Sequence, residues 1–149
     1  MLYRKVESVP PPMCIKVLIA DDTAVMRNAI RILLGGKPEI ELVAEAENFA
    51  QSLSLTRKFK PQVIILDLHM PDSEHLTPMN VSEGLRAYEA AVLAISVWHD
   101  EDTRALAQSY GATALLDKML LGQELIPAVM KLGSGSGPGR EAPPRSLFN

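Results

Sequence analysis

Five side chains stand out in this 149-residue sequence because residues of these types can together hold a cation and transfer a phosphoryl group. Asp21 and Asp22 directly follow a run of apolar residues, and Asp67 lies near the end of another. Ser96 and Lys118 occupy the same kind of position at the ends of two further apolar runs. Three carboxylates, a hydroxyl and an ammonium group are thus each placed at the end of a short apolar segment.

The charges of these side chains indicate what they can do together. Neighbouring carboxylates repel one another and raise each other's pKa. A hard cation such as Mg²⁺ relieves this repulsion, because it prefers a few carboxylates together with water and phosphate oxygens. The hydroxyl of Ser96 can donate a hydrogen bond to a phosphoryl oxygen. A carboxylate such as Asp67 can then attack a phosphorus donor to give an aspartyl phosphate, while the cation and Lys118 stabilise the transferred charge.

The apolar segments are predicted to be the strands of a parallel sheet. Their almost continuous apolar character is typical of strands buried on both faces, and the segments between them have helical periodicity. The expected strands are 15–20, 42–46, 63–68, 92–97 and 114–117. The expected helices are 23–34, 49–59, about 81–90, 100–110 and 122–132, the last with an internal proline.

This five-fold alternation of strand and helix predicts a doubly wound α/β fold. Parallel neighbours need crossover connections, and right-handed crossovers place helices on both faces of the sheet. In such a sheet the functional crevice lies beyond the carboxyl ends of the strands. The five chemically interesting residues are therefore expected to converge at that one edge.

Composition limits the domain organisation. Apolar residues make up 47% of the chain, enough for a core, and the net charge of −3 does not indicate nucleic-acid binding. No apolar run approaches the ~20 residues that span a bilayer. The single cysteine, Cys14, fits a reducing, cytoplasmic setting. We expect an N-terminal extension (1–13), one folded domain (14–132) and a Gly/Ser-rich disordered tail or linker (133–149).

The order and spacing of the five candidate site residues resemble those of the receiver domains of response regulators in two-component signalling. The matching elements are an acidic pair after the first strand, an aspartate followed by Leu-His-Met-Pro, a serine ending the fourth strand and a lysine after the fifth. The first aspartate, Asp67, Ser96 and Lys118 are separated by 46, 29 and 22 residues, as in that family. The resemblance covers the whole folded part. It implies a flavodoxin-like (βα)5 fold with strand order 2-1-3-4-5.

The resemblance also assigns a role to each residue. Asp67 would be the phospho-acceptor, and Ser96 and Lys118 would contact the phosphoryl group. A set of oxygens would hold Mg²⁺: the carboxylates of Asp21, Asp22 and Asp67 and the backbone carbonyl of His69. A histidine kinase would donate the phosphoryl group and a downstream protein would bind the switched surface, while homodimerisation stays open. The chain would thus be a signalling phospho-acceptor that assists its own phosphorylation and dephosphorylation, rather than an enzyme with its own substrate.

Two regions depart from the usual receiver pattern. His75 stands where receivers usually have a glycine, and Pro78 falls where a helix normally runs, so the third helix is expected to start late or to be distorted. Leu115 replaces the aromatic residue that often rotates as a switch. Met119, rather than proline, follows the lysine, which places the chain nearest to receivers that precede LuxR-type DNA-binding domains.

Three further residues concern the lifetime of the phosphoryl group. Val97, after the hydroxyl, is larger than the usual small residue and would crowd the phosphoryl site. His69 and Trp98 lie two residues beyond the acceptor and the hydroxyl, at positions that tune this lifetime in receivers. These residues predict a slow or unusual lifetime.

Other functions compete with this interpretation. A degenerate receiver would serve as a scaffold or dimerisation module without phosphoryl turnover. An aspartyl-phosphate phosphohydrolase would need additional substrate-binding elements, for which the chain has little room. A flavin binder would need a phosphate-cradling loop after the first strand, where Asp21 and Asp22 would repel the phosphate.

Overall fold

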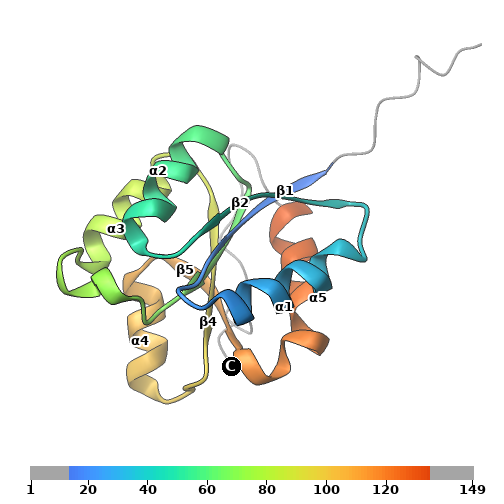
Figure 1. The fold of residues 1–149 in the computed structure, drawn as a ribbon. Coiled ribbons are helices and arrows are strands. Elements are labelled where there is room, and N and C mark those ends of the chain that lie inside the picture. Colours follow the sequence, from blue (N-terminus) through green and yellow to red (C-terminus); the bar gives the residue numbers. More distant parts are fainter. Residues whose placement is uncertain (1–13, 135–149) are drawn as a thin grey trace, which may run out of the picture.

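The computed structural model describes residues 14–134, which form a five-stranded parallel sheet between two layers of helices (Figure 1). The strands lie in the order β2-β1-β3-β4-β5, so the predicted α/β class and strand order are confirmed. The strands are β1 (Ile15–Ala20), β2 (Ile40–Ala46), β3 (Val63–Asp67), β4 (Ala91–Ser96) and β5 (Ala112–Asp117). The helices are α1 (Ala24–Gly35), α2 (Phe49–Phe59), α3 (Pro78–Arg86), α4 (Glu101–Ser109) and α5 (Leu121–Ser134), with short 3-10 helices η2 (Pro71–Glu74) and η3 (Lys118–Leu120).

The sheet separates two apolar cores because successive side chains of a strand point to opposite faces. In β1, Val17 and Ile19 belong to one core, whereas Leu18 and Ala20 belong to the other. All four side chains are fully buried. The almost continuous apolar sequence of the central strands is therefore explained by burial on both faces.

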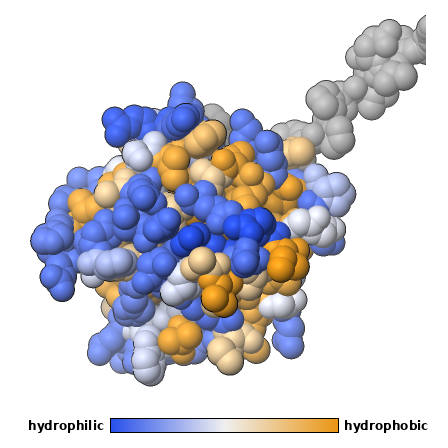
Figure 2. All heavy atoms as spheres, in the orientation of Figure 1, coloured by the Kyte–Doolittle hydropathy of each residue, from blue (hydrophilic) through white to orange (hydrophobic). Residues whose placement is uncertain are grey.

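Each core is closed by its own helices. One core contains residues of α1 and α5, and the other contains residues of α2, α3 and α4, as Figure 1 shows for the two faces of the sheet. In the view of Figure 2 the surface over α3 and α4 is mainly hydrophilic, and apolar residues are more frequent toward α1 and α5. Two apolar residues of α1, Val25 and Ile32, expose most of their side chains.

The strand register brings the carboxyl ends of the central strands together. Ala20 pairs with Leu66, so the residues that follow β1 lie beside Asp67 at the end of β3. Asp67 pairs with Ile95, and Ser96 is the next residue of β4. The predicted convergence of these positions at one edge of the sheet therefore follows from backbone pairing alone.

The start of the third helix differs from the prediction. We expected the helix to begin near Val81, but α3 begins at Pro78, with Thr77 as its N-cap accepting a hydrogen bond from the Asn80 N–H at 3.1 Å. Proline is well suited to the first helical turn, because its φ is already helical and its missing N–H would be unpaired there anyway. The Thr-Pro pair was thus a helix start signal rather than a loop signal.

The other boundaries differ from the prediction by at most two residues, except that α3 ends at Arg86, about four residues before its predicted end. β2 begins at Ile40 and β5 at Ala112, each earlier than predicted, and α5 continues through Pro127 to Ser134. Gly133, which we had assigned to the tail, is buried in α5, where a Cβ atom would lie 2.6 Å from methyl carbons of Ile15. The expected extension (1–13) and the rest of the expected tail (135–149) lie outside the described residues.

Candidate functional site

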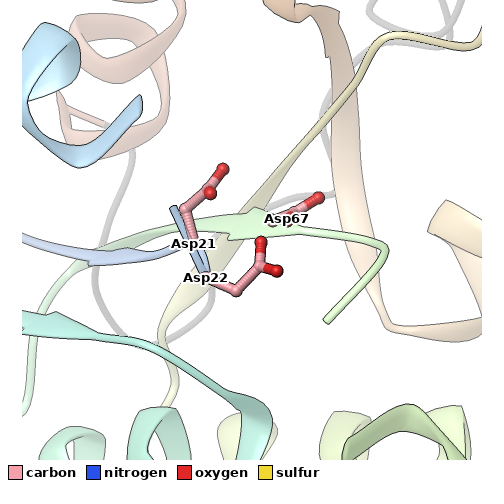
Figure 3. A group of neighbouring side chains, drawn as sticks. All are labelled: Asp21, Asp22 and Asp67. Carbon is pink, nitrogen blue, oxygen red and sulfur yellow. The ribbon is translucent and has the colours of Figure 1, made fainter. Parts of the chain in front are cut away.

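The three predicted aspartates lie together at the carboxyl edge of the sheet (Figure 3). Asp21 and Asp22 follow β1, and Asp67 ends β3. One carboxylate oxygen from each lies within 4.8 Å of the other two. Asp21 and Asp67 are buried and Asp22 is exposed, so the cluster is open to solvent on the side of Asp22.

Asp21 is fixed by the start of α1. Its Oδ1 accepts hydrogen bonds from the backbone N–H and the hydroxyl of Thr23, at 2.9 and 3.0 Å. Thr23 in turn caps α1, and Arg27 donates a hydrogen bond to the Asp21 carbonyl at 2.7 Å. Oδ1 therefore has a structural role, which leaves Oδ2 to face the cluster.

Lys118 lies between the two buried carboxylates. Its Nζ is 2.9 Å from Asp21 Oδ2 and 3.3 Å from Asp67 Oδ1. Burial by itself would lower the pKa of Lys118, but the hydrogen bonds and negative charges of Asp21 and Asp67 outweigh burial and raise the pKa above its ordinary value. The side chain therefore remains a cation and partly neutralises the cluster.

Asp67 has the most perturbed carboxyl group of the site. Burial, followed by the negative charge of Asp21, raises the pKa of Asp67 to about 6. The charge of Lys118 and the hydrogen bond from the His69 N–H, at 3.2 Å, lower the pKa and offset part of the rise. A carboxylate that is costly to ionise gains the most from an added cation, as expected of a metal or phosphoryl site.

Ser96 lies at the same edge, at the end of β4, and is buried. Its Oγ accepts a hydrogen bond from the Trp98 N–H at 3.0 Å, which fixes the start of the loop between β4 and α4. The side chains of Val97 and Trp98 in this loop are exposed. Any movement of the Ser96 hydroxyl would therefore also change the loop that carries Trp98.

His69 takes part through its backbone rather than through its side chain. Its N–H donates to Asp67 Oδ1, and the imidazole is exposed. The structure therefore places the main chain of His69 beside the Asp67 carboxylate.

Two contacts around the site could not be predicted from the sequence. The carboxylate of Asp72 accepts hydrogen bonds from two backbone N–H groups at the start of α2. His99 Nε2 lies 2.9 Å from Asp117 Oδ2, which joins the β4–α4 loop to the residue before Lys118. Both contacts join residues 18 or more positions apart, and no local motif predicts such pairs.

A surface pocket of about 300 Å³ adjoins the site on the β5 side. Its lining residues are His99, Leu115, Asp117, Leu120 and Glu124. Leu115, which stands at the position of the aromatic switch residue, is half-buried here. The pocket connects the β4–α4 loop to the segment that carries Lys118.

Comparisons with known proteins agree with this geometry. Residues 17–130 match the family described as the response regulator receiver domain. A protein-glutamate methylesterase/protein-glutamine glutaminase of Pyrococcus horikoshii is 32% identical over 70% of this chain and 28% of its own length. The transcriptional regulatory protein DegU of Brevibacillus brevis is 29% identical over 81% of this chain and 51% of its own. The chain thus spans about half or less of these relatives.

Solved structures give the same result. The signal receiver domain of the putative response regulator NarL from Mycobacterium tuberculosis is 28% identical and covers 83% of this chain and 99% of its own, with a TM-score of 0.73. The response regulator domain of Thermotoga maritima CheB shares the fold at 20% identity, with a TM-score of 0.71 and 83% of this chain covered against 99% of its own. Within the described residues no helix is long and apolar enough to cross a membrane. On the strength of the match over residues 17–130 and of the fold, this chain belongs to the response regulator receiver domain family.

Proposed function

We propose that this chain is a phosphorylation-controlled switch in which Asp67 accepts a phosphoryl group with the help of Mg²⁺. The observation that supports the proposal most is the acidic cluster, in which three carboxylates face one another with Lys118 between two of them. A buried carboxylate whose pKa is raised to about 6 is an unusual feature of a stable fold and is typical of a functional site.

The donor set of the cluster fits Mg²⁺. Carboxylates of Asp21, Asp22 and Asp67 supply hard oxygen ligands, and the exposed position of Asp22 gives a hydrated ion access. The backbone carbonyl of His69 is proposed as a further ligand, because the N–H of the same residue already binds Asp67. When bound, the ion would supply positive charge next to the transferred phosphoryl oxygens.

The remaining residues have distinct roles in the proposed reaction. Asp67 provides the attacking oxygen, and the ammonium group of Lys118 stabilises the negative charge of the transferred group. The Ser96 hydroxyl exchanges its present hydrogen bond from the Trp98 N–H for one to a phosphoryl oxygen. This exchange changes the β4–α4 loop and the adjoining pocket, which we propose as part of the surface that a downstream protein distinguishes.

The phosphoryl donor is proposed to be a histidine kinase. Asp67 is buried, but the cluster opens to solvent beside Asp22, and we propose that a phosphohistidine approaches Asp67 from this side, where its P–N bond breaks as the P–O bond to Asp67 forms. A scaffold that no longer takes up phosphate is the second candidate, because Leu115 takes the place of the aromatic switch residue.

Phosphorylation by a small donor tests the proposal. The purified chain is incubated with acetyl phosphate and Mg²⁺, and its intact mass and Trp98 fluorescence are followed. We expect a mass gain of one phosphoryl group that requires Mg²⁺ and is absent in Asp67→Asn. Absence of both phosphorylation and Mg²⁺ binding in the wild-type chain would contradict the proposal and favour the scaffold.

A further inference from the structure

The segment that follows the acceptor strand is attached to helix α2 by the carboxylate of Asp72. Asp72 lies in η2, five residues after Asp67. Its Oδ1 accepts from the Phe49 N–H and its Oδ2 from the Ala50 N–H, both at 2.9 Å. Each oxygen of one carboxylate thus binds a separate backbone donor of another element.

The partners of Asp72 belong to a helix terminus that needs such acceptors. The first N–H groups of a helix lack intrahelical partners, and a negative charge is favourable there. The side-chain Oδ1 of Asn48, the N-cap of α2, accepts from the Gln51 N–H at 2.8 Å, and its backbone carbonyl accepts from the Ser52 N–H at 3.1 Å. Asp72 completes the cap from a distant part of the chain, so the contact holds two elements together as well as ending a helix.

Within residues 68–76 of the described chain, no other side chain forms a hydrogen bond to another element. The bonds of η2 are internal: the Ser73 N–H donates to the Met70 carbonyl, and the N–H groups of His75 and Leu76 donate to the Asp72 carbonyl. Met70 is buried in the core, which adds an apolar anchor two residues before Asp72. Besides this apolar anchor, the side-chain hydrogen bonds that hold η2 to a neighbouring element are those of Asp72 to α2.

Residues 68–71 connect Asp72 to the proposed acceptor, Asp67. Leu68 and Met70 are buried and His69 between them is exposed, and Met70 directly precedes η2, so a displacement of η2 is transmitted to His69 through Met70. The His69 N–H binds Asp67 Oδ1 at 3.2 Å. A shift of η2 away from α2 would therefore move the main chain that contacts the acceptor carboxylate.

We infer that Asp72 is a positioning residue of the phospho-acceptor site: by binding the Phe49 and Ala50 N–H groups, it keeps the His69 main chain against Asp67. The inference rests on the proposed function for its effect on Mg²⁺ and phosphorylation. The pair of hydrogen bonds from the Phe49 and Ala50 N–H groups to the Asp72 carboxylate, here called the clamp, is itself seen in the structure. Its consequence is that the start of α2, which contributes no carboxylate to the acidic cluster, controls how well the cluster holds a cation.

Three variants of the full chain distinguish a positioning role of Asp72 from a helix-capping role and from an effect of its negative charge. Asp72→Ala removes the clamp. Asn48→Ala removes the other side-chain acceptor at the same helix terminus without touching η2. Glu74→Gln removes a negative charge from η2 at an exposed residue. Urea unfolding is measured for all three, together with the Kd for Mg²⁺ by calorimetry and the rate of phosphorylation by acetyl phosphate.

We expect Asp72→Ala to raise the Kd for Mg²⁺ about tenfold, as is typical when a residue that orients a metal ligand is removed. Its phosphorylation rate should fall at a fixed, subsaturating Mg²⁺ concentration and recover at high Mg²⁺. Asn48→Ala should lose stability but keep the Kd within about twofold of wild type, and Glu74→Gln should keep both. Equal Mg²⁺ affinity in Asp72→Ala and Asn48→Ala, at equal stability, would reduce Asp72 to a helix cap and overturn the inference.

Amide exchange of His69 distinguishes this inference from the proposed function. The clamp predicts that Asp72→Ala speeds hydrogen exchange at the His69 N–H and shifts its NMR resonance, whereas Asn48→Ala leaves both near the wild-type values. If the wild-type chain neither binds Mg²⁺ nor takes up phosphate, the proposed function fails. The difference in His69 N–H exchange between Asp72→Ala and Asn48→Ala would still show whether Asp72 holds the His69 main chain in place. Unchanged exchange at His69 in Asp72→Ala would refute the clamp directly.

Discussion

Replacing the buried Asp67 with the isosteric, neutral asparagine should stabilise the protein at neutral pH. Burial and the charge of Asp21 raise the pKa of Asp67 from 3.8 to about 6. A difference of one pKa unit corresponds to about 1.36 kcal/mol, so keeping Asp67 ionised in the fold costs about 3 kcal/mol. Asp67→Asn removes this cost, because the amide does not ionise.

The sign of the pH dependence follows from the direction of the shift. Between pH 4 and pH 6 the folded state binds a proton at Asp67 that the unfolded state has already released. The wild-type contribution of Asp67 to stability is therefore greatest below pH 4 and is lost as pH rises through 6. The advantage of Asp67→Asn should be absent below pH 4 and approach about 3 kcal/mol at pH 8.

Urea unfolding in EDTA between pH 4 and pH 8 measures this difference. Wild type and Asp67→Asn are compared at each pH, and the midpoint and the m-value are fitted separately. Addition of Mg²⁺ at pH 8 should narrow the gap, because the cation stabilises the ionised Asp67. A variant that is less stable than wild type at pH 8, or a gap that does not change with pH, would refute the reasoning.

Three more substitutions test other parts of the structure. Lys118→Met leaves two buried carboxylates without their cation, so it should destabilise the fold at pH 8 by about 3–5 kcal/mol, and less at pH 5, in urea unfolding. Asp22→Asn affects an exposed side chain, so calorimetry should show weaker Mg²⁺ binding while the unfolding midpoint in EDTA stays near wild type. Gly84→Ala places a Cβ 2.5 Å from Leu53 Cδ2 between α3 and α2, and we expect displacement of the half-buried Leu53 side chain to outweigh the ~1 kcal/mol gained in helix propensity, for a net cost of about 1 kcal/mol. An unchanged midpoint in Gly84→Ala or Lys118→Met would contradict the packing of Gly84 against Leu53 or the role of Lys118 as counter-ion, respectively. Unchanged Mg²⁺ binding in Asp22→Asn would contradict the proposed role of Asp22 as a ligand.

The parts of the fold that the sequence predicted well are those governed by local periodicity and by burial. Helix α2 has the predicted bounds, Phe49–Phe59, because an asparagine cap precedes it and a lysine in the left-handed conformation before Pro61 ends it. The central strands were recognised because strands buried on both faces need continuous apolar residues. The convergence of Asp21, Asp67 and Lys118 followed from placing the strand ends at one edge of the sheet.

The parts that the sequence did not predict depend on long-range contacts or on the meaning of a proline. Pro78 was taken as a sign of a loop, although it occupies the first turn of α3. β5 begins two residues earlier than its apolar pattern suggested, where the register against β4 shifts between Val92 and Leu93. The contacts of Asp72 with α2 could not be predicted, because nothing local in an aspartate after a proline specifies a partner more than 20 residues away.

The ion pairs of Lys118 also determine whether folding depends on Mg²⁺. The fold carries an internal counter-ion for its two buried carboxylates, so their repulsion is reduced as soon as β5 joins the sheet. Completion of folding then does not have to wait for a cation from solution. Under the proposed function, a fall in available Mg²⁺ would therefore stop phosphorylation of Asp67 while leaving the fold intact, and phosphorylation would resume without refolding when Mg²⁺ returns.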